Sequence, residues 1–206
     1  MTRLRPLLTA LAAALLAVTA CDPGGDPGPN YSSVSPTPSA STSASPTASP
    51  SPTVPTTGPN VSPGELAPTE PVDATTSTAE SAQSFETYYV RTIDWVYATS
   101  VPQILEPFFA EGCTNCTNLL NNLQGQLEGG RSFRGSRFTI QRLAEVTNDG
   151  RNGADFAVSV EVAISPLQIL DSTGEVTESA PETSLTLTNW LRWDGSRWAI
   201  VDQGKA

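Results

Sequence analysis

The chain has 206 residues, with 21 acidic and 11 basic side chains, a formal net charge of −10 and no histidine. The acidic balance argues against nucleic-acid binding, and the missing histidine excludes His-based catalytic triads and His-bearing zinc sites. The chain also has no glycine-rich phosphate loop and no nucleophile elbow. We therefore expect no metal, no cofactor and no nucleic-acid partner.

The N-terminus has the pattern of a secretory signal. The chain opens MTRLRPLLTALAAALLAVTAC, in which Arg3 and Arg5 precede an apolar run. This run is about a dozen residues long, whereas a membrane-spanning helix needs roughly 20. We expect residues 1–20 to be a signal peptide that directs the rest of the chain out of the cytoplasm.

The end of this segment, Val18-Thr19-Ala20-Cys21, resembles the lipobox of bacterial lipoproteins. The resemblance implies cleavage before Cys21, a diacylglyceryl group on the Cys21 thiol and an acyl group such as palmitate on the new amino group. Several acyl chains on one residue anchor a protein stably, where a single chain is marginal. The resemblance therefore implies a membrane partner and a location on the outer face of the cell membrane.

Residues 21–80 have the composition of a disordered tether. Thirteen prolines lie between Pro23 and Pro71, among Ser, Thr, Gly and Ala, and large apolar residues are scarce. Such a segment cannot bury enough apolar surface to offset the entropy lost on ordering. We expect a spacer between membrane and domain, and the same composition also fits an O-glycosylated stalk.

The composition changes at about Ser81, and residues 81–206 have the length of one ordinary domain. Apolar residues spaced three and four apart predict helices at its start. Their predicted ranges are 81–100, 100–112 and 113–130. Ser100 is the expected N-cap of the second helix, and Gly129-Gly130 is the expected end of the third.

The pattern then changes to the alternation of strands. Four antiparallel strands are expected over residues 136–146 and 154–164 and on either side of Asp194-Gly195 within residues 184–202. In the first strand, Leu143 or Arg142 continues the inward face after a shift. Helices followed by strands predict an α+β domain, with N-terminal helices packed on a curved antiparallel sheet.

This order of elements is similar to the nuclear-transport-factor-like fold, a cone of curved sheet wrapped by helices. More narrowly, the lipobox, the tether and a pattern FxxYY…CxxC…GG before the strands resemble a family of uncharacterised actinobacterial lipoproteins. The matching residues are Phe85, Tyr88, Tyr89, Cys113, Cys116, Gly129 and Gly130. Where that family has a small Gly-Asp step before the second helix, this chain has Ala98-Thr99-Ser100. The resemblance implies an envelope protein and does not imply an activity.

Cys113 and Cys116 are expected to form a disulfide bond, because Cys21 is expected to carry lipid and the compartment is oxidising. The bond would brace the start of the third helix. A redox role is the alternative, since a cysteine at a helix N-terminus has a lowered pKa. The βαβ order of thioredoxin-like proteins is absent before this motif.

Two further groups of side chains are candidates for binding. Aromatic residues that would line a pocket between sheet and helices, or fill the core, are Tyr88, Tyr89, Trp95, Tyr97, Phe108 and Phe109. Basic residues that would contact an anionic envelope polymer, or form a solvated strand face, are Arg131, Arg134, Arg137 and Arg142.

These features favour a lipid-anchored, non-catalytic envelope module that binds a protein partner or a small apolar ligand. The alternative is an extracytoplasmic enzyme. It would be either a dithiol oxidoreductase at Cys113 and Cys116 or an acid–base pocket enzyme, for which Asp94 and Tyr97 lie on the same predicted helix.

Overall fold

α1 (Ala79–Thr99) is the central helix of the computed structural model, which describes residues 53–205. The Thr78 hydroxyl caps its N-terminus by accepting a hydrogen bond from the Ser81 amide at 3.2 Å. Ser100 ends the helix in the left-handed conformation, with a φ of 59°. The first predicted helix is therefore confirmed. No helix within residues 53–205 is both long and apolar enough to cross a membrane.

A 3₁₀ helix, a second α-helix and a short 3₁₀ turn follow. Their bounds are η2 Pro102–Phe108, α2 Thr114–Leu127 and η3 Glu128–Gly130. The predicted N-cap of η2 is wrong, because Ser100 closes α1 and Val101 precedes η2. Gly129 adopts a φ of 74° just after α2, as expected of a helix-ending glycine.

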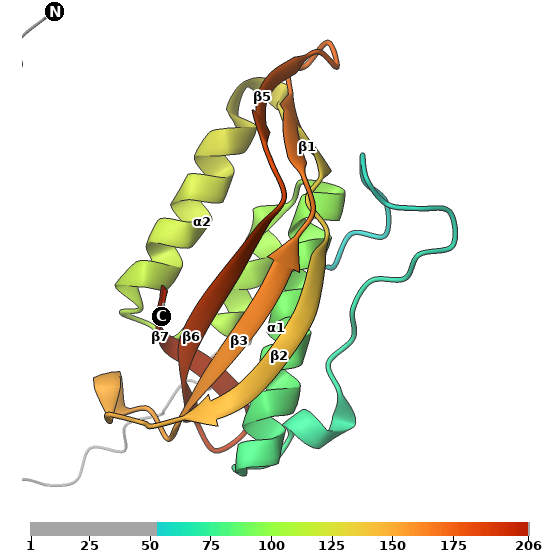
Figure 1. Cartoon of the computed structure of the whole chain (residues 1–206). Coiled ribbons are helices and arrows are strands. Elements are labelled where there is room, and N and C mark those ends of the chain that lie inside the picture. Colours follow the sequence, from blue (N-terminus) through green and yellow to red (C-terminus); the bar gives the residue numbers. More distant parts are fainter. Residues whose placement is uncertain (1–52, 206) are drawn as a thin grey trace, which may run out of the picture. The chain divides into compact units, whose positions relative to one another are not determined.

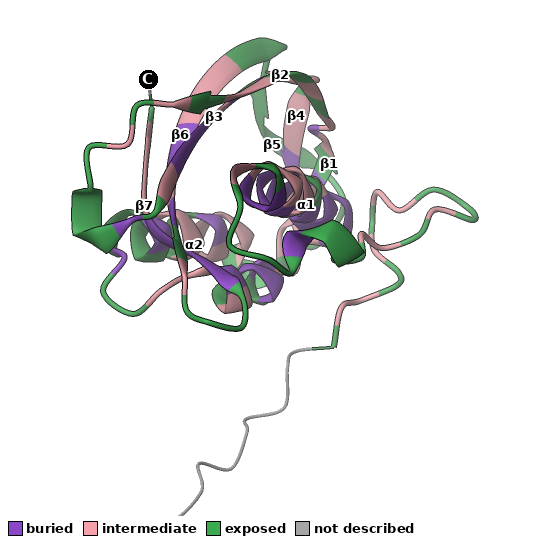
Figure 2. Cartoon of the chain, turned by 90° about the horizontal axis from the view of Figure 1, so that it is seen from below, coloured by how far each residue is buried: buried purple, intermediate pink, exposed green. Residues whose placement is uncertain are grey.

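Four antiparallel strands form a sheet that curves around α1, as Figure 1 and Figure 2 show. In spatial order they are β2 Phe138–Val146, β3 Phe156–Ile164, β6 Thr183–Trp193 and β7 Trp198–Lys205. A bulge between Ile140 and Arg142 shifts β2, so that Leu143 lies opposite the buried Val160. The four predicted strands and the α+β class are confirmed.

Three further strands form a second sheet that the sequence did not predict. In the order β1-β4-β5 they are Ser132–Gly135, Leu167–Leu170 and Val176–Ala180. Figure 1 places this sheet at the end of the molecule where α2 terminates. Phe133 of β1 is fully buried, with its ring centroid 4.6 Å from that of Tyr97 on α1. Through this contact the second sheet shares the core of the first.

Residues 53–78, which we call the strap, pack against α1 and β1. The Trp95 indole Nε1 donates a hydrogen bond to the Pro55 carbonyl at 2.8 Å. The Asn60 side-chain amide donates to the carbonyls of Tyr97 at 3.1 Å and Phe133 at 2.9 Å. In Figure 1 the strap is the blue-green trace beside α1 and β2. It contains the 3₁₀ turn η1 (Val72–Ala74), and a further one, η4 (Arg151–Gly153), precedes β3.

The strap approaches α1 closely and is also tied by charge. A Cβ atom at Gly58 would overlap the Thr99 Cα, so only glycine fits there. Arg137 forms ion pairs with Glu65 of the strap and Asp94 of α1. The hydrogen bonds that Arg137 donates to the Glu65 carboxylate lower the pKa of Glu65 to about 2.

The strap corrects the predicted tether. The sequence predicted disorder up to residue 80, whereas residues 53–78 have defined hydrogen-bond partners in the domain. The composition argument failed there because the partners are backbone groups and polar side chains contributed from distant positions. Residues 79 and 80 of the predicted tether belong to α1. The predicted signal, Cys21 and residues 22–52 of the tether lie outside the described residues.

Candidate ligand-binding groove

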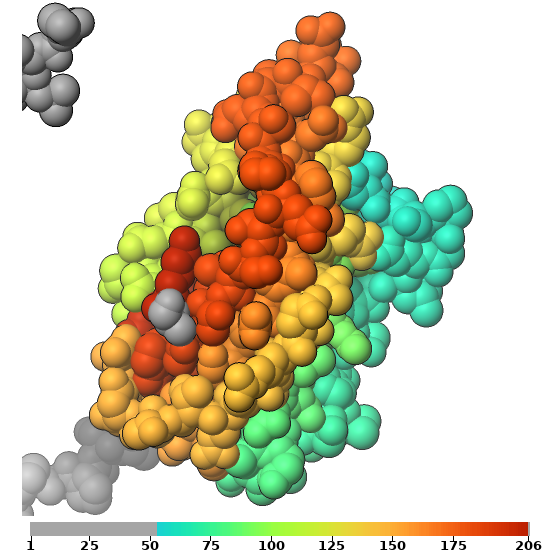
Figure 3. Space-filling model, in the orientation of Figure 1, coloured from blue at the N-terminus to red at the C-terminus, as the bar shows by residue number. Residues whose placement is uncertain are grey.

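An apolar groove of about 360 Å³ lies between α1, α2 and the concave face of the four-stranded sheet. Nine of its thirteen lining residues are aromatic or aliphatic. They are Tyr89, Ile93, Tyr97, Leu119, Leu123, Phe138, Ile164, Leu185 and Leu187. Figure 3 shows the hollow side of the molecule, between α2 and β6. A mainly apolar hollow with a few polar groups is the usual form of a small-molecule site.

Helical and strand periodicity bring these residues together. Tyr89, Ile93 and Tyr97 are four residues apart on α1, and Leu119 and Leu123 have the same spacing on α2, so each set shares one helix face. On the sheet, Phe138 pairs with Ile164, and Leu185 and Leu187 are alternate residues of β6. The groove therefore crosses the sheet between the two helices.

The floor of the groove is buried, but its walls are not. Tyr89 is 0% exposed and Leu123 is 2% exposed. The side chains of Leu119, Phe138, Ile164, Leu185 and Leu187 are half-buried, so their groove faces contact solvent. Covering apolar surface is worth about 25 cal/mol per Å². These walls would consequently favour an apolar occupant.

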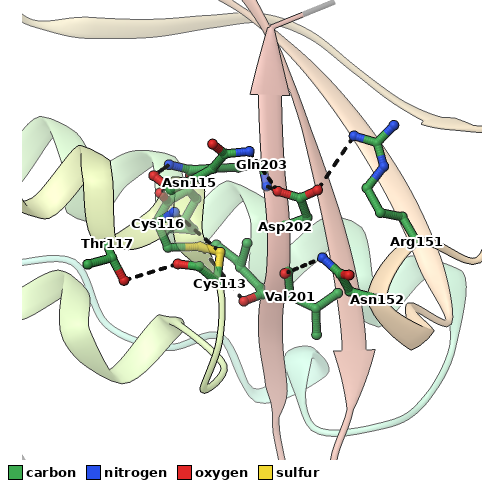
Figure 4. The surroundings of a disulfide bond; sticks show 11 residues. Cys113, Asn115, Cys116, Thr117, Arg151, Asn152, Val201, Asp202 and Gln203 are labelled. Carbon is green, nitrogen blue, oxygen red and sulfur yellow. Dashed lines mark hydrogen bonds and ion pairs between the residues drawn. A yellow bond between two sulfur atoms is a disulfide. The ribbon is translucent and has the colours of Figure 1, made fainter. Parts of the chain in front are cut away.

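A chain of hydrogen bonds closes one end of the groove. The Tyr89 hydroxyl donates to the Gln203 side-chain oxygen at 2.9 Å, and the Gln203 amide donates to the Asn115 carbonyl at 3.2 Å. The Asn115 side-chain amide donates to Asp202 at 2.9 Å, as Figure 4 shows. These polar groups already have partners within the protein, so the groove does not need a ligand to satisfy them.

Cys113 and Cys116 form a disulfide bond with their Cα atoms 5.3 Å apart. Both residues are buried, at 2% and 0% exposure. The Cys113 sulfur accepts a hydrogen bond from the Cys116 amide at 3.3 Å, and the Cys113 carbonyl accepts one from the Thr117 hydroxyl at 3.1 Å (Figure 4). The bond thus fixes the first turn of α2, one turn before Leu119. Thiol exchange needs access to a sulfur atom, which this burial does not give.

The six predicted pocket aromatics divide among three environments. Tyr89 and Tyr97 line the groove. Tyr88 and Phe108 line a separate hollow of about 250 Å³ that the strap residue Val54 helps to form. The other two aromatics, Trp95 and Phe109, do not line either hollow. Trp95 is buried and holds the strap, whereas Phe109 is half-buried with its ring 6.1 Å from that of Tyr89.

The sequence did not single out the aliphatic half of the groove. Its leucine and isoleucine side chains follow regular periodicity, but that signal marks a core residue equally well. Only the curvature of the sheet and the separation of α2 from α1 leave these side chains partly uncovered.

The predicted arginine cluster does not form a common anion site. Arg131 pairs with Glu178 at 3.2 Å, and Arg137 pairs with Asp94 and Glu65, which raise its pKa. Arg134 donates to the Gln168 side-chain oxygen at 2.8 Å. Two of the three positive charges are thus neutralised within the chain. Arg142, the fourth residue of the candidate set, is an exposed residue of β2.

Asp94 does not form the carboxylate–tyrosine pair that an acid–base enzyme would need. Its carboxylate accepts hydrogen bonds from the Arg137 guanidinium and from the Phe138 amide, at 2.8 Å for the amide. It therefore joins α1 to β2 and the strap. Within residues 53–205, there is no cluster of three Cys, His, Asp or Glu side chains that would hold a metal ion.

A buried carboxyl group, Glu86, lies on α1 one turn before Tyr89 and was not predicted. Its side chain is fully buried and accepts a hydrogen bond from the Asn189 amide of β6 at 2.7 Å. Burial raises the pKa of Glu86 to about 8, although the hydrogen bond from Asn189 lowers it in part. Glu86 is therefore mainly neutral at pH 7. The sequence feature that could have indicated this buried carboxyl group is a glutamate on the apolar face of the predicted helix.

Comparison with known proteins identifies a family but no activity. The pattern of a family of unknown function, DUF6318, matches residues 62–204. None of the curated proteins matches the chain. The family match begins inside the strap, 19 residues before the domain boundary that the composition predicted.

Several solved structures are similar in fold. The intermembrane-space region of the chloroplast protein ARC6 is 11% identical, with 63% of this chain and 97% of that chain covered and a TM-score of 0.44. A Nostoc punctiforme protein of unknown function with a cystatin-like fold is 12% identical, with coverages of 62% and 91% and a TM-score of 0.37. A periplasmic fragment of TraM is 16% identical, with coverages of 63% and 98% and a TM-score of 0.37.

Proposed function

The chain belongs to the DUF6318 family of unknown function, and we propose that it is a lipid-anchored, extracytoplasmic module that binds a small apolar ligand in the groove. The observation that carries the proposal is the set of half-buried aliphatic and aromatic walls around an open hollow. The location rests on the N-terminal sequence, which carries the signal pattern and the lipobox ending at Cys21.

The residues that line the groove support ligand binding without catalysis. The groove lining includes no carboxylate or thiol, and the polar groups at its closed end are hydrogen-bonded to one another. Glu86 is buried behind the groove and is not part of its lining. A ligand would thus be held by apolar contact and shape.

The first test is binding of N-phenyl-1-naphthylamine, a neutral dye whose fluorescence rises in apolar surroundings. The protein would be the chain from Asp22 onward, which lacks the predicted signal and lipid and needs no detergent. We expect saturable binding that Leu119→Gln weakens about tenfold, because the variant removes about 1.4 kcal/mol of apolar contact.

Leu120→Gln is the matched control, since Leu120 is a half-buried neighbour on α2 that does not line the groove. It should leave the dye affinity unchanged. Absence of saturable binding, or equal weakening by the two substitutions, would contradict the proposal.

A further inference from the structure

Lys205 places a positive charge at the groove. It is the only lysine of the chain and the last residue of β7. Lys205 lies opposite Leu187 in the β6–β7 ladder, and both residues line the groove. Because cross-strand partners project to the same face of a sheet, the Lys205 side chain lies on the concave side.

The charge of the groove is opposite to that of the whole chain. The chain carries a net charge of −10. The thirteen lining residues, however, include Lys205 and no aspartate or glutamate. Within the described part of the chain, Lys205 forms no ion pair, whereas Arg131, Arg137, Arg151 and Arg197 each pair with a carboxylate.

The apolar surface extends from Lys205 in one direction. Leu187 is its neighbour on β6, and Leu185 follows two residues away on the same strand. Beyond them, Ile164 of β3 and Phe138 of β2 are paired at the far side of the sheet. An elongated molecule lying along this line would have one end at an ammonium group and the rest against apolar side chains.

We propose that the ligand is an amphiphile whose apolar body lies in the groove and whose terminal carboxylate or phosphate pairs with Lys205. This rests on the proposed function and specifies its ligand class. The anionic group is held by a charge-assisted hydrogen bond from the ammonium at the edge of an apolar surface. Long-range repulsion from an acidic protein is offset at this one edge of the groove.

The test is displacement of N-phenyl-1-naphthylamine from the chain beginning at Asp22, at pH 7.5. Decanoate, decyl phosphate and decanol share one chain length and differ in the head group. We expect at least one of the two anions to displace the dye at a concentration about twofold to fivefold lower than decanol, the range of an exposed ion pair. The anion that displaces the dye at the lower concentration shows whether the groove prefers a carboxylate or a phosphate head group.

Substitutions at Lys205 assign the effect to its charge. Lys205→Gln should remove the preference for the anion, and Lys205→Arg should keep it. Arg192→Gln is the matched control. It removes the same charge from an exposed residue next to the buried Leu191 on β6, hence on the outer face of the sheet. Since Lys205 is exposed, its substitution leaves the core intact.

The outcomes separate this inference from the proposed function. If the dye does not bind, the groove itself is not a ligand site. If the dye binds and decanol displaces it as well as either anion does, or if Lys205→Gln keeps the preference, the groove binds ligands and the role of Lys205 is wrong.

Discussion

Glu86 and Asn189 form a hydrogen-bonded polar pair inside an apolar core, and the protonation state of Glu86 determines which hydrogen bonds the pair can make. One Glu86 oxygen accepts the Asn189 amide, whereas Glu86 Oε2 and Asn189 Oδ1 have no partner among the protein atoms. A carboxylic acid supplies an O–H donor that a carboxylate lacks. We therefore expect the neutral acid to be the form that the folded core accommodates.

This pair predicts that stability falls with rising pH. The ordinary pKa of the Glu86 carboxyl is 4.5, and the folded protein raises it to about 8. Between these values the unfolded chain loses a proton that the folded chain keeps, so the contribution of Glu86 is present below pH 4.5 and is lost toward pH 8. The loss is about 1.4 kcal/mol per pH unit as an upper bound.

Urea unfolding at pH 5, 6, 7 and 8 measures this slope. Glu86→Gln should flatten it, because an amide does not titrate in this range. Glu161→Gln, at an exposed position of β3, should keep the slope of the unchanged chain. An equal slope with and without the Glu86 carboxyl would show that other groups cause the pH dependence.

At the scale of elements, periodicity predicted the structure wherever one face of an element is buried. α1, α2, β3, β6 and β7 contain buried residues, and in β2 half-buried residues alternate with exposed ones along most of the strand. β5 (Val176–Ala180) is exposed along its whole length, so its residues do not alternate in hydrophobicity. β1 and β4 have four residues each, too few to establish a period. The second sheet was therefore not predictable by the same rule.

The strap and the groove were missed for related reasons. The strap is fixed by polar contacts such as Asn60 to Phe133, which join residues 73 apart in sequence. No local pattern records such a pairing. The groove depends on where α2 lies relative to the sheet. Leu119 and Leu185 would have the same sequence signal in a closed core.

The contacts of the strap lead us to expect that a domain cut at residue 81, the boundary predicted from composition, is less stable than the domain with the strap. A chain that begins at residue 81 lacks Pro55, Asn60 and Glu65. It leaves the buried Trp95 indole without its acceptor, which alone costs about 1–3 kcal/mol. Thermal unfolding of chains beginning at residues 53 and 81 would measure the difference.

We expect the chain from residue 53 to melt at the same temperature as the chain from Asp22. The chain from residue 81 should melt at least about 3 °C lower, the shift that corresponds to roughly 1 kcal/mol in a domain of this size. Equal melting temperatures for all three chains would mean that the strap contacts do not stabilise the domain.

At the scale of the whole molecule, the strap shortens the predicted spacer between membrane and domain. With residues 53–78 held on the domain, only residues 22–52 remain for that role. A flexible coil of this length, as the composition predicts, spans roughly 30 Å. With the lipid on Cys21 that the sequence predicts, the domain would lie close to the bilayer, from which an amphiphilic ligand would come.

Membrane attachment itself is predicted to depend on Cys21. Cys21→Ala removes the thiol that would carry the diacylglyceryl group, so the variant should lose the lipid anchor. Labelling cells with an alkyne-bearing fatty acid should mark the unchanged chain and not the variant. Cys113→Ala with Cys116→Ala is the control that keeps the lipid site, and its labelling should persist. A labelled Cys21→Ala chain would contradict the anchor.

The strap also has a consequence for the order of folding. It precedes α1 in the chain and so leaves the ribosome before the rest of the domain. Asn60 of the strap donates hydrogen bonds to the carbonyl groups of Phe133 and Gly135. These two residues belong to β1 and lie 73 and 75 residues after Asn60. Contacts of such long range form late. The strap can therefore complete its contacts with the domain only after β1 has been synthesised, although it precedes α1 in the chain.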